Sequence, residues 1–437
     1  MSFDAPIAPS RRIAIIGSGI AGMAAALKLA PANRVTLIEA EPRLGGHART
    51  VIAGKNGDQP VDTGFIVFNY ANYPHLTRMF MDLDVPVEKS NMSFGVSLDN
   101  GRVEYALRSL GSVFAQRQNM LRPEFLGMLR DIMRFNARAV EAAESDDITV
   151  YELISKLGLG EAFRRDYLLP ICGAIWSTPS GEVGAFPARS LVRFFQNHAL
   201  MSPKGQHQWW TVSGGSIEYV KRLEARLRLL GVDIRPNCPV GSVHRDAAGV
   251  TVRPVGGEDE RFDDVILACH SDQALKLLAD ASPEERADLS AVSYRPNRAI
   301  LHADPRQMPM RRACWSSWVY RAQKVGAETE VGVTYWMNRL QNIPENDPLF
   351  VTLNPQTEVR EDLIYDEVTF DHPVFDQAAL AAQKRIAQRN GTNRTWFAGA
   401  WLRFGFHEDG FASAMRVHRD MTRDGVLSQA SPLGIPA

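Results

Sequence analysis

Short apolar runs separated by a helical pattern open the chain. The runs lie at Ile13–Ile16 and Val35–Ile38, and an Ala- and Leu-rich helical pattern lies between them. Mostly apolar runs of this length are typical of strands that are buried on both faces of a parallel sheet. The order predicts a strand–helix–strand unit, and further apolar runs at residues 261–269 and 395–400 predict later strands near the same site. We therefore predict an α/β fold.

The turn after the first run carries candidate chemistry. It reads Gly17-Ser18-Gly19-Ile20-Ala21-Gly22, and Glu39 follows the second run, 22 residues after Gly17. In a dinucleotide site the first glycine allows a tight turn, the second leaves room for a pyrophosphate, and the third lets the helix pack closely on the strand. The helix N-terminus attracts the phosphates, and an acid at the position of Glu39 accepts the hydroxyls of a ribose. The alternative is a glycine-rich turn that binds nothing.

The spacing of apolar residues changes twice in the rest of the chain. Residues 106–145 have helical periodicity and carry several arginines, whereas aromatic-rich apolar runs between 299 and 353 predict a mostly antiparallel sheet. Pro170–Pro179 is small and apolar with one tryptophan, which suits either a pocket wall for an apolar substrate or a helix–helix contact. We predict a discontinuous nucleotide-binding domain of residues 1–95, 205–285 and 390–437, with a substrate domain of residues 96–204 and 286–389.

Composition narrows the class of protein. The 437 residues are 45% hydrophobic and 23% charged, with a formal net charge of −1, so no global field points to nucleic acid. The four cysteines show no CxxC spacing, so we expect reduced thiols in a cytoplasmic protein and no metal site. Arg11-Arg12 before an apolar run resembles a twin-arginine export signal. We assign that run to the first strand instead, because cleavage would destroy the glycine turn.

A second glycine pair gives the chain a family resemblance. Gly45-Gly46-His47-Ala48-Arg49-Thr50 follows Glu39 closely. Together with the first motif, it resembles the flavin amine oxidase and phytoene desaturase superfamily. The resemblance implies non-covalent FAD, bound by a Rossmann-like domain of the glutathione-reductase type with an inserted α+β substrate domain. Two positions depart from the family pattern: His47 replaces an arginine, and Glu39-Ala40-Glu41 replaces Glu-Ala-Arg.

The resemblance also assigns further cofactor contacts. Thr63, Gly64 and Phe65 lie in a segment that we expect to run as a strand against the flavin ring, although a buried strand with a bulge glycine fits the residues too. Val240 would contact the adenine, and Gly399 would end a strand beside the ribityl chain. We expect a helix from Phe411, with Asp409 and Gly410 offering backbone amides to the flavin. The full set of predicted cofactor residues is Gly17, Ser18, Gly19, Ala21, Gly22, Glu39, Ala40, Gly45, Gly46, His47, Thr63, Gly64, Phe65, Val240, Gly399, Asp409 and Gly410.

The tail supplies the candidate catalytic residues, His407 and Glu408. His407 matches a position where amine oxidases carry an aromatic side chain, and Trp401 replaces an acid that many of them have. A histidine beside a flavin suits a general acid–base or substrate-orienting role, and the alternative is a structural hydrogen bond.

A narrower resemblance concerns the substrate. Segments such as VDTGFIVFN and GFHEDG resemble a bacterial branch of predicted FAD-dependent proteins, typically encoded beside cyclopropane-fatty-acid-synthase-like methyltransferases. The resemblance implies hydride transfer from an unsaturated, methylated or cyclopropyl fatty acyl chain to flavin N5, giving desaturation or a double-bond shift. Amine oxidation is one alternative, and a non-catalytic flavin-binding accessory of a lipid methyltransferase is another. The basic helices of residues 106–145 suit a solvated face, or else peripheral contact with the inner membrane.

Overall fold

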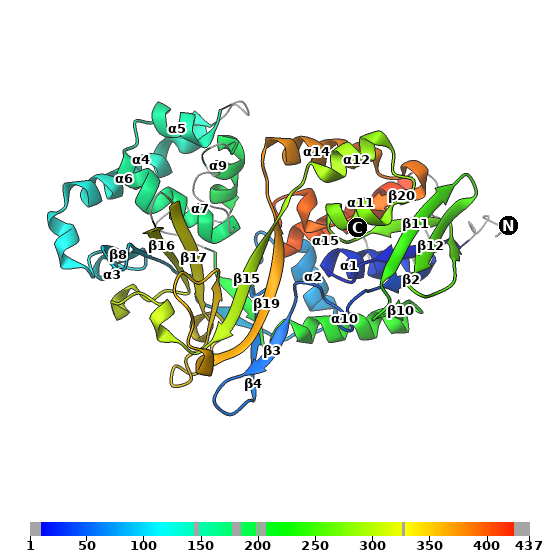
Figure 1. Cartoon of the computed structure of the whole chain (residues 1–437), viewed down its shortest axis with the longest axis horizontal. Coiled ribbons are helices and arrows are strands. Elements are labelled where there is room, and N and C mark those ends of the chain that lie inside the picture. The colour runs from blue at the N-terminus through cyan, green and yellow to red at the C-terminus, as the bar shows by residue number, and fades with distance from the viewer. Residues whose placement is uncertain are drawn as a thin grey trace, which may run out of the picture.

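A computed structural model describes residues 10–143, 148–176, 184, 186–197, 201, 207–325 and 328–423. Two parts lie side by side in it (Figure 1). One part contains a parallel sheet covered by helices, and the other contains a larger mixed sheet with a helical layer at its far side. Among the described residues, no helix is both long enough and apolar enough to cross a bilayer.

The parallel sheet has five strands in the order β10-β2-β1-β14-β20. The predicted strand–helix–strand unit is confirmed as β1, α1 (Ile20–Leu29) and β2, and β1 pairs on both sides. The run after Arg11-Arg12 is therefore the central strand. The strands are β10 (Asp233–Arg235), β2 (Arg34–Ile38), β1 (Arg12–Ile16), β14 (Asp264–Leu267) and β20 (Thr395–Phe397).

Alternate residues of β1 face different cores, because successive side chains of a strand point to opposite faces. Ile13 and Ile15 pack on a helical layer, whereas Ala14 and Ile16 pack on the other side. The first layer consists of α1, α2 (Pro74–Asp82), α10 (Ile217–Leu229) and α15 (His407–Arg423). The second consists of β11 (Val240–Asp246), β12 (Gly249–Pro254), β13 (Glu260–Phe262), α11 (Ser271–Leu277), α12 (Pro283–Ser290) and α14 (Gln377–Arg389).

The other part is built on a seven-stranded sheet. Most neighbours are antiparallel, as expected, but β7 joins β16 in parallel. The order β19-β15-β18-β17-β16-β7-β8 brings residues near 100 beside residues near 320. The strands are β19 (Ile364–Pro373), β15 (Tyr294–His302), β18 (Phe350–Leu353), β17 (Glu328–Trp336), β16 (Trp318–Val325), β7 (Phe94–Leu98) and β8 (Val103–Ala106).

A helical layer covers β7, β8, β16 and β17 (Figure 1). The predicted helical character of residues 106–145 is confirmed by α3 and α4, and Tyr105, Phe135 and Phe195 are buried at the contact with the sheet. Ser177–Pro179 of the predicted pocket wall lie outside the described residues. The helices are α3 (Leu110–Val113), α4 (Pro123–Ala142), α5 (Val150–Lys156), α6 (Glu161–Phe163), α7 (Leu169–Trp176) and α9 (Ala188–Asn197).

Two small sheets and several short helices complete the fold. β3 (Thr50–Ala53) pairs with β4 (Gln59–Asp62), and β9 (Trp209–Val212) lies between β5 (Val67–Phe68) and β6 (Val87–Ser90). The remaining elements are α13 (Met337–Leu340), η1 (Arg117–Leu121), η2 (Arg164–Leu168), η3 (Pro305–Gln307), η4 (Arg312–Cys314), η5 (Glu361–Leu363), η6 (Thr392–Arg394) and η7 (Ala400–Leu402).

Two domain boundaries and one expected strand differ from what the sequence suggests. The chain leaves the nucleotide-binding side between β6 and β7, so the predicted boundary at 95/96 falls inside β7. Helix α14 packs in the core of the parallel sheet, although its residues fall in the predicted substrate segment. The segment 63–66 bends instead of continuing β4, because the Gly64 position lies directly against the His47 carbonyl oxygen and Phe65 N–H donates to that oxygen.

Candidate functional site

One large cavity joins the two parts of the molecule. Its volume is about 1550 Å³. It begins at the turn after β1, passes the loop 46–49 and the bend at 63–66, and reaches the strands β7, β16 and β17 with the helices α7 and α9. A single cavity of this size has room for a dinucleotide and a substrate next to it.

The turn after β1 is shaped by three glycines with different constraints. Gly17 has φ +104°, and a Cβ there would lie 2.7 Å from the Ala268 carbonyl oxygen. A Cβ on Gly22 would lie 1.9 Å from the Gly17 carbonyl oxygen, so this glycine lets α1 approach the turn. A Cβ on Gly19 would meet no atom within 4 Å, because Gly19 faces the open cavity. The open space and the start of α1 form the cradle that a diphosphate needs.

Glu39 closes the nucleotide end of the cavity. Its carboxylate accepts hydrogen bonds from the Ser18 backbone N–H at 2.7 Å, the Ser18 hydroxyl at 2.6 Å and the Glu41 backbone N–H at 2.9 Å. These bonds fix the carboxylate at the carboxyl end of β2, where it can accept ribose hydroxyls.

The second glycine pair supports the first turn. Gly45 N–H donates to the Ser18 carbonyl oxygen at 3.0 Å, and a Cβ on Gly46 would lie 3.0 Å from Gly19 Cα. Both glycines have positive φ, which L side chains rarely adopt. The pair therefore brings His47 to the cavity wall beside the first turn.

Three histidines meet on the cavity wall. The ring centroid of His47 lies 5.9 Å from that of His270 and 6.1 Å from that of His372, and Phe370 stacks on His47 at 4.9 Å. Burial, assisted by the neighbouring imidazoles, lowers the pKa of His47 to about 3 and that of His372 to about 4. These side chains are therefore neutral hydrogen-bonding groups near pH 7. No group of described residues is arranged to hold a metal ion.

Helix α15 begins at His407, four residues earlier than expected, and this changes the amides that it offers. Gly410 N–H already donates to the Phe406 carbonyl oxygen within the first turn, so it is not a free donor. The Asp409 carboxylate accepts from the backbone N–H groups of Phe404 and Phe406 at 3.2 and 3.0 Å. The expectation that Gly410 presents its amide to the flavin is therefore corrected. Asp409 lies in the first helical turn, where amides have no intrahelical partner, so its contact with the flavin stays a prediction.

His407 is held on two sides at the cavity wall. Its ring stacks on Phe65 with centroids 3.9 Å apart, and its Nε2 lies 2.6 Å from the Tyr219 hydroxyl oxygen. Burial lowers the pKa of His407 to about 3 and raises the pKa of Tyr219 well above its ordinary value. Among the described residues the Tyr219 hydroxyl has no other hydrogen-bond partner, so its proton belongs in this bond. Nε2 is then occupied as an acceptor, which favours the orienting role for His407 over the general-base role.

Glu408 has a structural position instead of a catalytic one. Its carboxylate accepts from the backbone N–H groups of His75 at 2.9 Å and Leu76 at 3.0 Å, which lie in the first turn of α2. It does not line the cavity. Burial raises its pKa to about 7. The expectation of a catalytic Glu408 is corrected, because the carboxylate caps α2.

The far end of the cavity is apolar, and among its described lining residues Arg108 is the one cation. Aromatic and aliphatic side chains from β7, α7, α9, β9, β16 and β17 form its wall. Arg108, in the loop after β8, also lines the cavity and makes no hydrogen bond or ion pair within the described part of the chain. We call this region the apolar end; its lining residues are Met92, Phe94, Leu107, Arg108, Tyr167, Ile171, Phe194, Trp209, Trp318, Tyr335 and Leu353.

Most predicted cofactor residues converge on this one cavity, although they come from distant segments. Gly22, Gly45, Asp409 and Gly410 stand behind the wall instead of lining it, with the packing and hydrogen-bonding positions described above. The predicted residues that line the cavity are Gly17, Ser18, Gly19, Ala21, Glu39, Ala40, Gly46, His47, Thr63, Gly64, Phe65, Val240, Gly399 and His407.

Several lining residues were missed from the sequence. His270 follows β14, and the rule that ligands bind at the carboxyl ends of parallel strands could have found it. His372 lies at the end of β19, far along the chain, and only the sheet brings it to His47. Arg108 was one of several arginines in a helical segment, and nothing in that pattern sets it apart.

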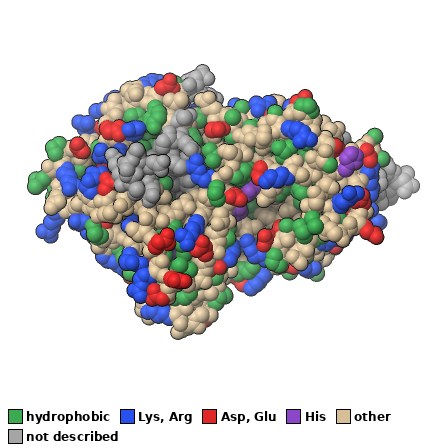
Figure 2. All heavy atoms as spheres, viewed as in Figure 1, with side chains coloured by type: hydrophobic (Ala, Val, Ile, Leu, Met, Phe, Trp, Pro, Cys, Tyr) green, Lys and Arg blue, Asp and Glu red, His purple; other side chains and the backbone are tan. Residues whose placement is uncertain are grey.

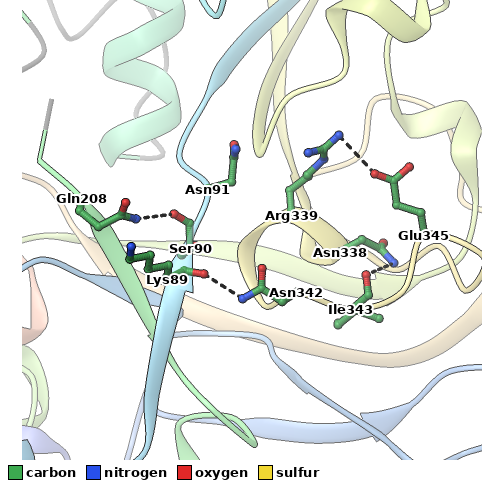
Figure 3. Close-up of a pocket in the computed structure, with 9 residues that line it drawn as sticks. All are labelled: Lys89, Ser90, Asn91, Gln208, Asn338, Arg339, Asn342, Ile343 and Glu345. Carbon is green, nitrogen blue, oxygen red and sulfur yellow. Dashed lines mark hydrogen bonds and ion pairs between the residues drawn. The ribbon is translucent and has the colours of Figure 1, made fainter. Parts of the chain in front are cut away.

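A smaller pocket of about 420 Å³ lies beside the large cavity and shares Asn91 with it (Figure 3). Its polar side chains are largely satisfied by nearby backbone and by one ion pair. Gln208 donates to the Ser90 carbonyl oxygen, Asn342 donates to that of Lys89, and Arg339 pairs with Glu345 at 3.2 Å. These bonds tie β6 and β9 to the loop after α13.

The parallel sheet, the glycine cradle, the ribose acid and the adjoining cavity define a dinucleotide-binding oxidoreductase. The family model described as flavin containing amine oxidoreductase matches residues 20–316. The chain therefore belongs to this family, and its cofactor is FAD. The residues present fit that group, because Gly19 leaves the open space that a diphosphate needs and Glu39 is fixed beside it.

Solved structures share this fold over nearly the whole chain. One is the CLA-producing fatty acid isomerase from P. acnes, with a TM-score of 0.64, 15% identity, and coverage of 94% of this chain and 98% of that chain. Another is putrescine oxidase bound to putrescine, with a TM-score of 0.62, 16% identity and coverage of 96% and 99%. Cyclohexylamine oxidase from Brevibacterium oxydans IH-35A also has a TM-score of 0.62 and 16% identity, with coverage of 95% and 100%. At these identities the likeness concerns the fold alone.

Proposed function

We propose that this FAD-dependent oxidoreductase acts on an unsaturated, methylated or cyclopropyl fatty acyl chain with an anionic end. The observation that supports this substrate is the apolar end of the cavity, with Arg108 as its cation. An acyl chain would fill the aromatic and aliphatic wall, and Arg108 would attract a carboxylate or phosphate. A fatty acid isomerase with the same fold indicates that such a scaffold accommodates this class of substrate.

Bound FAD would supply hydride acceptance, which gives a new double bond with loss of a proton, or a shifted double bond when the hydride is returned. The chain itself would position the substrate and exclude water. Phe65 and Tyr219 fix the His407 ring at the wall, and Nδ1–H of the neutral imidazole is left as a hydrogen-bond donor. Because Nε2 is occupied by Tyr219, His407 would orient the substrate instead of removing its proton.

The charges of the cavity wall disfavour an amine substrate. Its acidic residues are Glu39, Glu41 and Asp371, and the first two lie beside the glycine turn while the third flanks His372. No acidic side chain of the described residues lines the apolar end to pair with an ammonium group. Arg108 would repel that group.

The test combines two substrates with two forms of the enzyme. Steady-state turnover of an unsaturated C18 fatty acid and its methyl ester is measured with the holoenzyme and with Arg108→Gln, and products are identified by mass spectrometry. An exposed ion pair is worth about 1 kcal/mol, so we expect about a fivefold rise in KM for the acid in the variant. Arg108→Lys is the matched control: it keeps the positive charge, so its KM for the acid should stay close to that of the wild type.

The ester lacks the charge, so the same substitution leaves its KM unchanged. Phosphatidylglycerol as a third substrate distinguishes a phospholipid from a free acid. Equal KM changes for acid and ester would contradict the role of Arg108, and oxidation of amines without turnover of any acyl substrate would contradict the proposed function.

A further inference from the structure

Exposed apolar side chains are concentrated in one segment, residues 107–140. Seven of the fifteen large hydrophobic side chains that are exposed in the described chain lie there. Leu121 is 86% exposed, Leu110 is 79% exposed and Met133 is 66% exposed. A concentration of exposed apolar side chains in one segment suggests an interaction site. We call this segment the helical patch; its exposed apolar residues are Leu107, Leu110, Met120, Leu121, Leu126, Met133 and Val140.

Helix α4 has apolar side chains on two faces. Phe125, Phe135 and other buried residues pack against the core of this part of the molecule. Leu126, Met133 and Val140 are exposed and are spaced by seven residues, so they form a stripe along the solvent face. A helix that only covers a core needs one apolar face, and the second face is left without a partner in the described chain.

The charge of the helical patch indicates what would cover it. Six arginines lie between residues 107 and 140, against two acids. Asp131 is buried and accepts from Gly160 N–H, which leaves Glu124 as the exposed acid of the segment. At the end of the molecule where α3 and α4 lie, blue cationic side chains are interspersed with green apolar ones (Figure 2). Arginines around exposed leucines and methionines complement an anionic lipid surface.

The helical patch is continuous with the cavity. Leu107 and Arg108 begin the patch and also line the apolar end. If the protein binds a membrane through this segment, the cavity lies beside the acyl chains of the lipids.

We propose that the helical patch docks on the surface of an anionic bilayer, with Leu110 and Leu121 inserted among the lipid headgroups. The exposed Arg117 and Arg138 would face lipid phosphates, whereas Arg122, Arg130 and Arg134 are bonded within the protein. Docking does not depend on the proposed function, because binding to vesicles needs no turnover.

Flotation of the FAD-loaded protein with vesicles tests the proposal. Vesicles of phosphatidylcholine with about 30% phosphatidylglycerol are compared with phosphatidylcholine alone, at low and high salt. We expect binding to the anionic vesicles that weakens with salt. Leu110→Ser with Leu121→Ser should lower the partition coefficient about tenfold or more, because two apolar anchors are lost.

The matched control is Leu229→Ser, a residue that is 81% exposed on α10 in the other part of the molecule. This control should bind vesicles like the wild type, and turnover of dissolved fatty acid should be unchanged in all variants because none of these leucines lines the cavity. Absence of binding to anionic vesicles, or an equal loss in the control, would overturn the proposal. A concentration-dependent dimer that the Leu110 and Leu121 changes abolish would also overturn it, since the patch would then bind a second copy.

Discussion

Gly19→Ala separates cofactor binding from folding more cleanly than any other change in the glycine turn. Gly19 has φ −64° and ψ 179°, which any L residue adopts, and its Cβ would meet no protein atom within 4 Å. The added methyl group therefore disturbs nothing in the protein alone. It occupies space in front of the start of α1, where the diphosphate of FAD needs to approach the backbone.

The expected magnitudes follow from this geometry. Without cofactor, the variant should be as stable as the wild type or more stable by up to about 1 kcal/mol, because alanine restricts the unfolded chain. Displacing the diphosphate from one charge-assisted hydrogen bond costs about 1.5–3 kcal/mol, so the Kd for FAD should rise about 10- to 100-fold. Protein stripped of flavin is unfolded with denaturant, and FAD is titrated by quenching of its fluorescence.

Gly22→Ala is the contrasting variant. Its Cβ would lie 1.9 Å from the Gly17 carbonyl oxygen, so the backbone must move. The free energy of unfolding of the cofactor-free protein should therefore fall by at least about 1–3 kcal/mol. Unchanged FAD affinity in Gly19→Ala would refute the assignment of the cradle. If the cofactor-free Gly19→Ala variant loses as much free energy of unfolding as Gly22→Ala, the space in front of Gly19 is not open.

Three further changes test particular residues. Glu408→Gln leaves one of the two backbone amides in α2 without an acceptor, so the free energy of unfolding in denaturant should fall by about 1–3 kcal/mol. FAD content and turnover per flavin should be retained, and a loss of turnover would restore a catalytic role for Glu408. Tyr219→Phe removes the partner of His407 Nε2, and we expect full FAD content with turnover about fivefold lower, whereas unchanged turnover would contradict the orienting role. Burial raises the pKa of Asp62 to about 6, above its unfolded value, so the folded chain binds this proton more tightly and stability falls as pH rises through that window. The asparagine of Asp62→Asn cannot ionise, so only the wild type loses this stability as the pH rises. The difference between their free energies of unfolding should shrink by about 2 kcal/mol between about pH 4.5 and pH 7.5. A difference in free energy of unfolding that stays constant with pH would contradict the raised pKa.

The nucleotide end of the site could be predicted because its signals are local. Gly17, Gly19, Gly22 and Glu39 lie within one strand–helix–strand unit, and their spacing carries the geometry. The apolar end could not be predicted in the same way. β7 pairs with β16 across more than two hundred residues of chain, and no local pattern states that register.

The tail shows why matching residues to a motif is not sufficient to assign roles. His407, Glu408 and Asp409 are adjacent in sequence, but α15 begins at His407, so their side chains point in different directions around the first helical turn. His407 faces the cavity, Glu408 caps α2, and Asp409 holds the loop before the helix. The sequence predicted polar chemistry at this place, and the starting residue of the helix decides which side chain reaches the cavity.

The proposed reaction is tested by anaerobic mixing of the FAD-loaded protein with an unsaturated C18 fatty acid, followed by the flavin spectrum and by mass analysis of the lipid. We expect the fatty acid to change the flavin absorbance and to be recovered with a new or shifted double bond. An unaltered spectrum and unaltered fatty acid, with bleaching of the flavin by a primary amine, would contradict the proposed function.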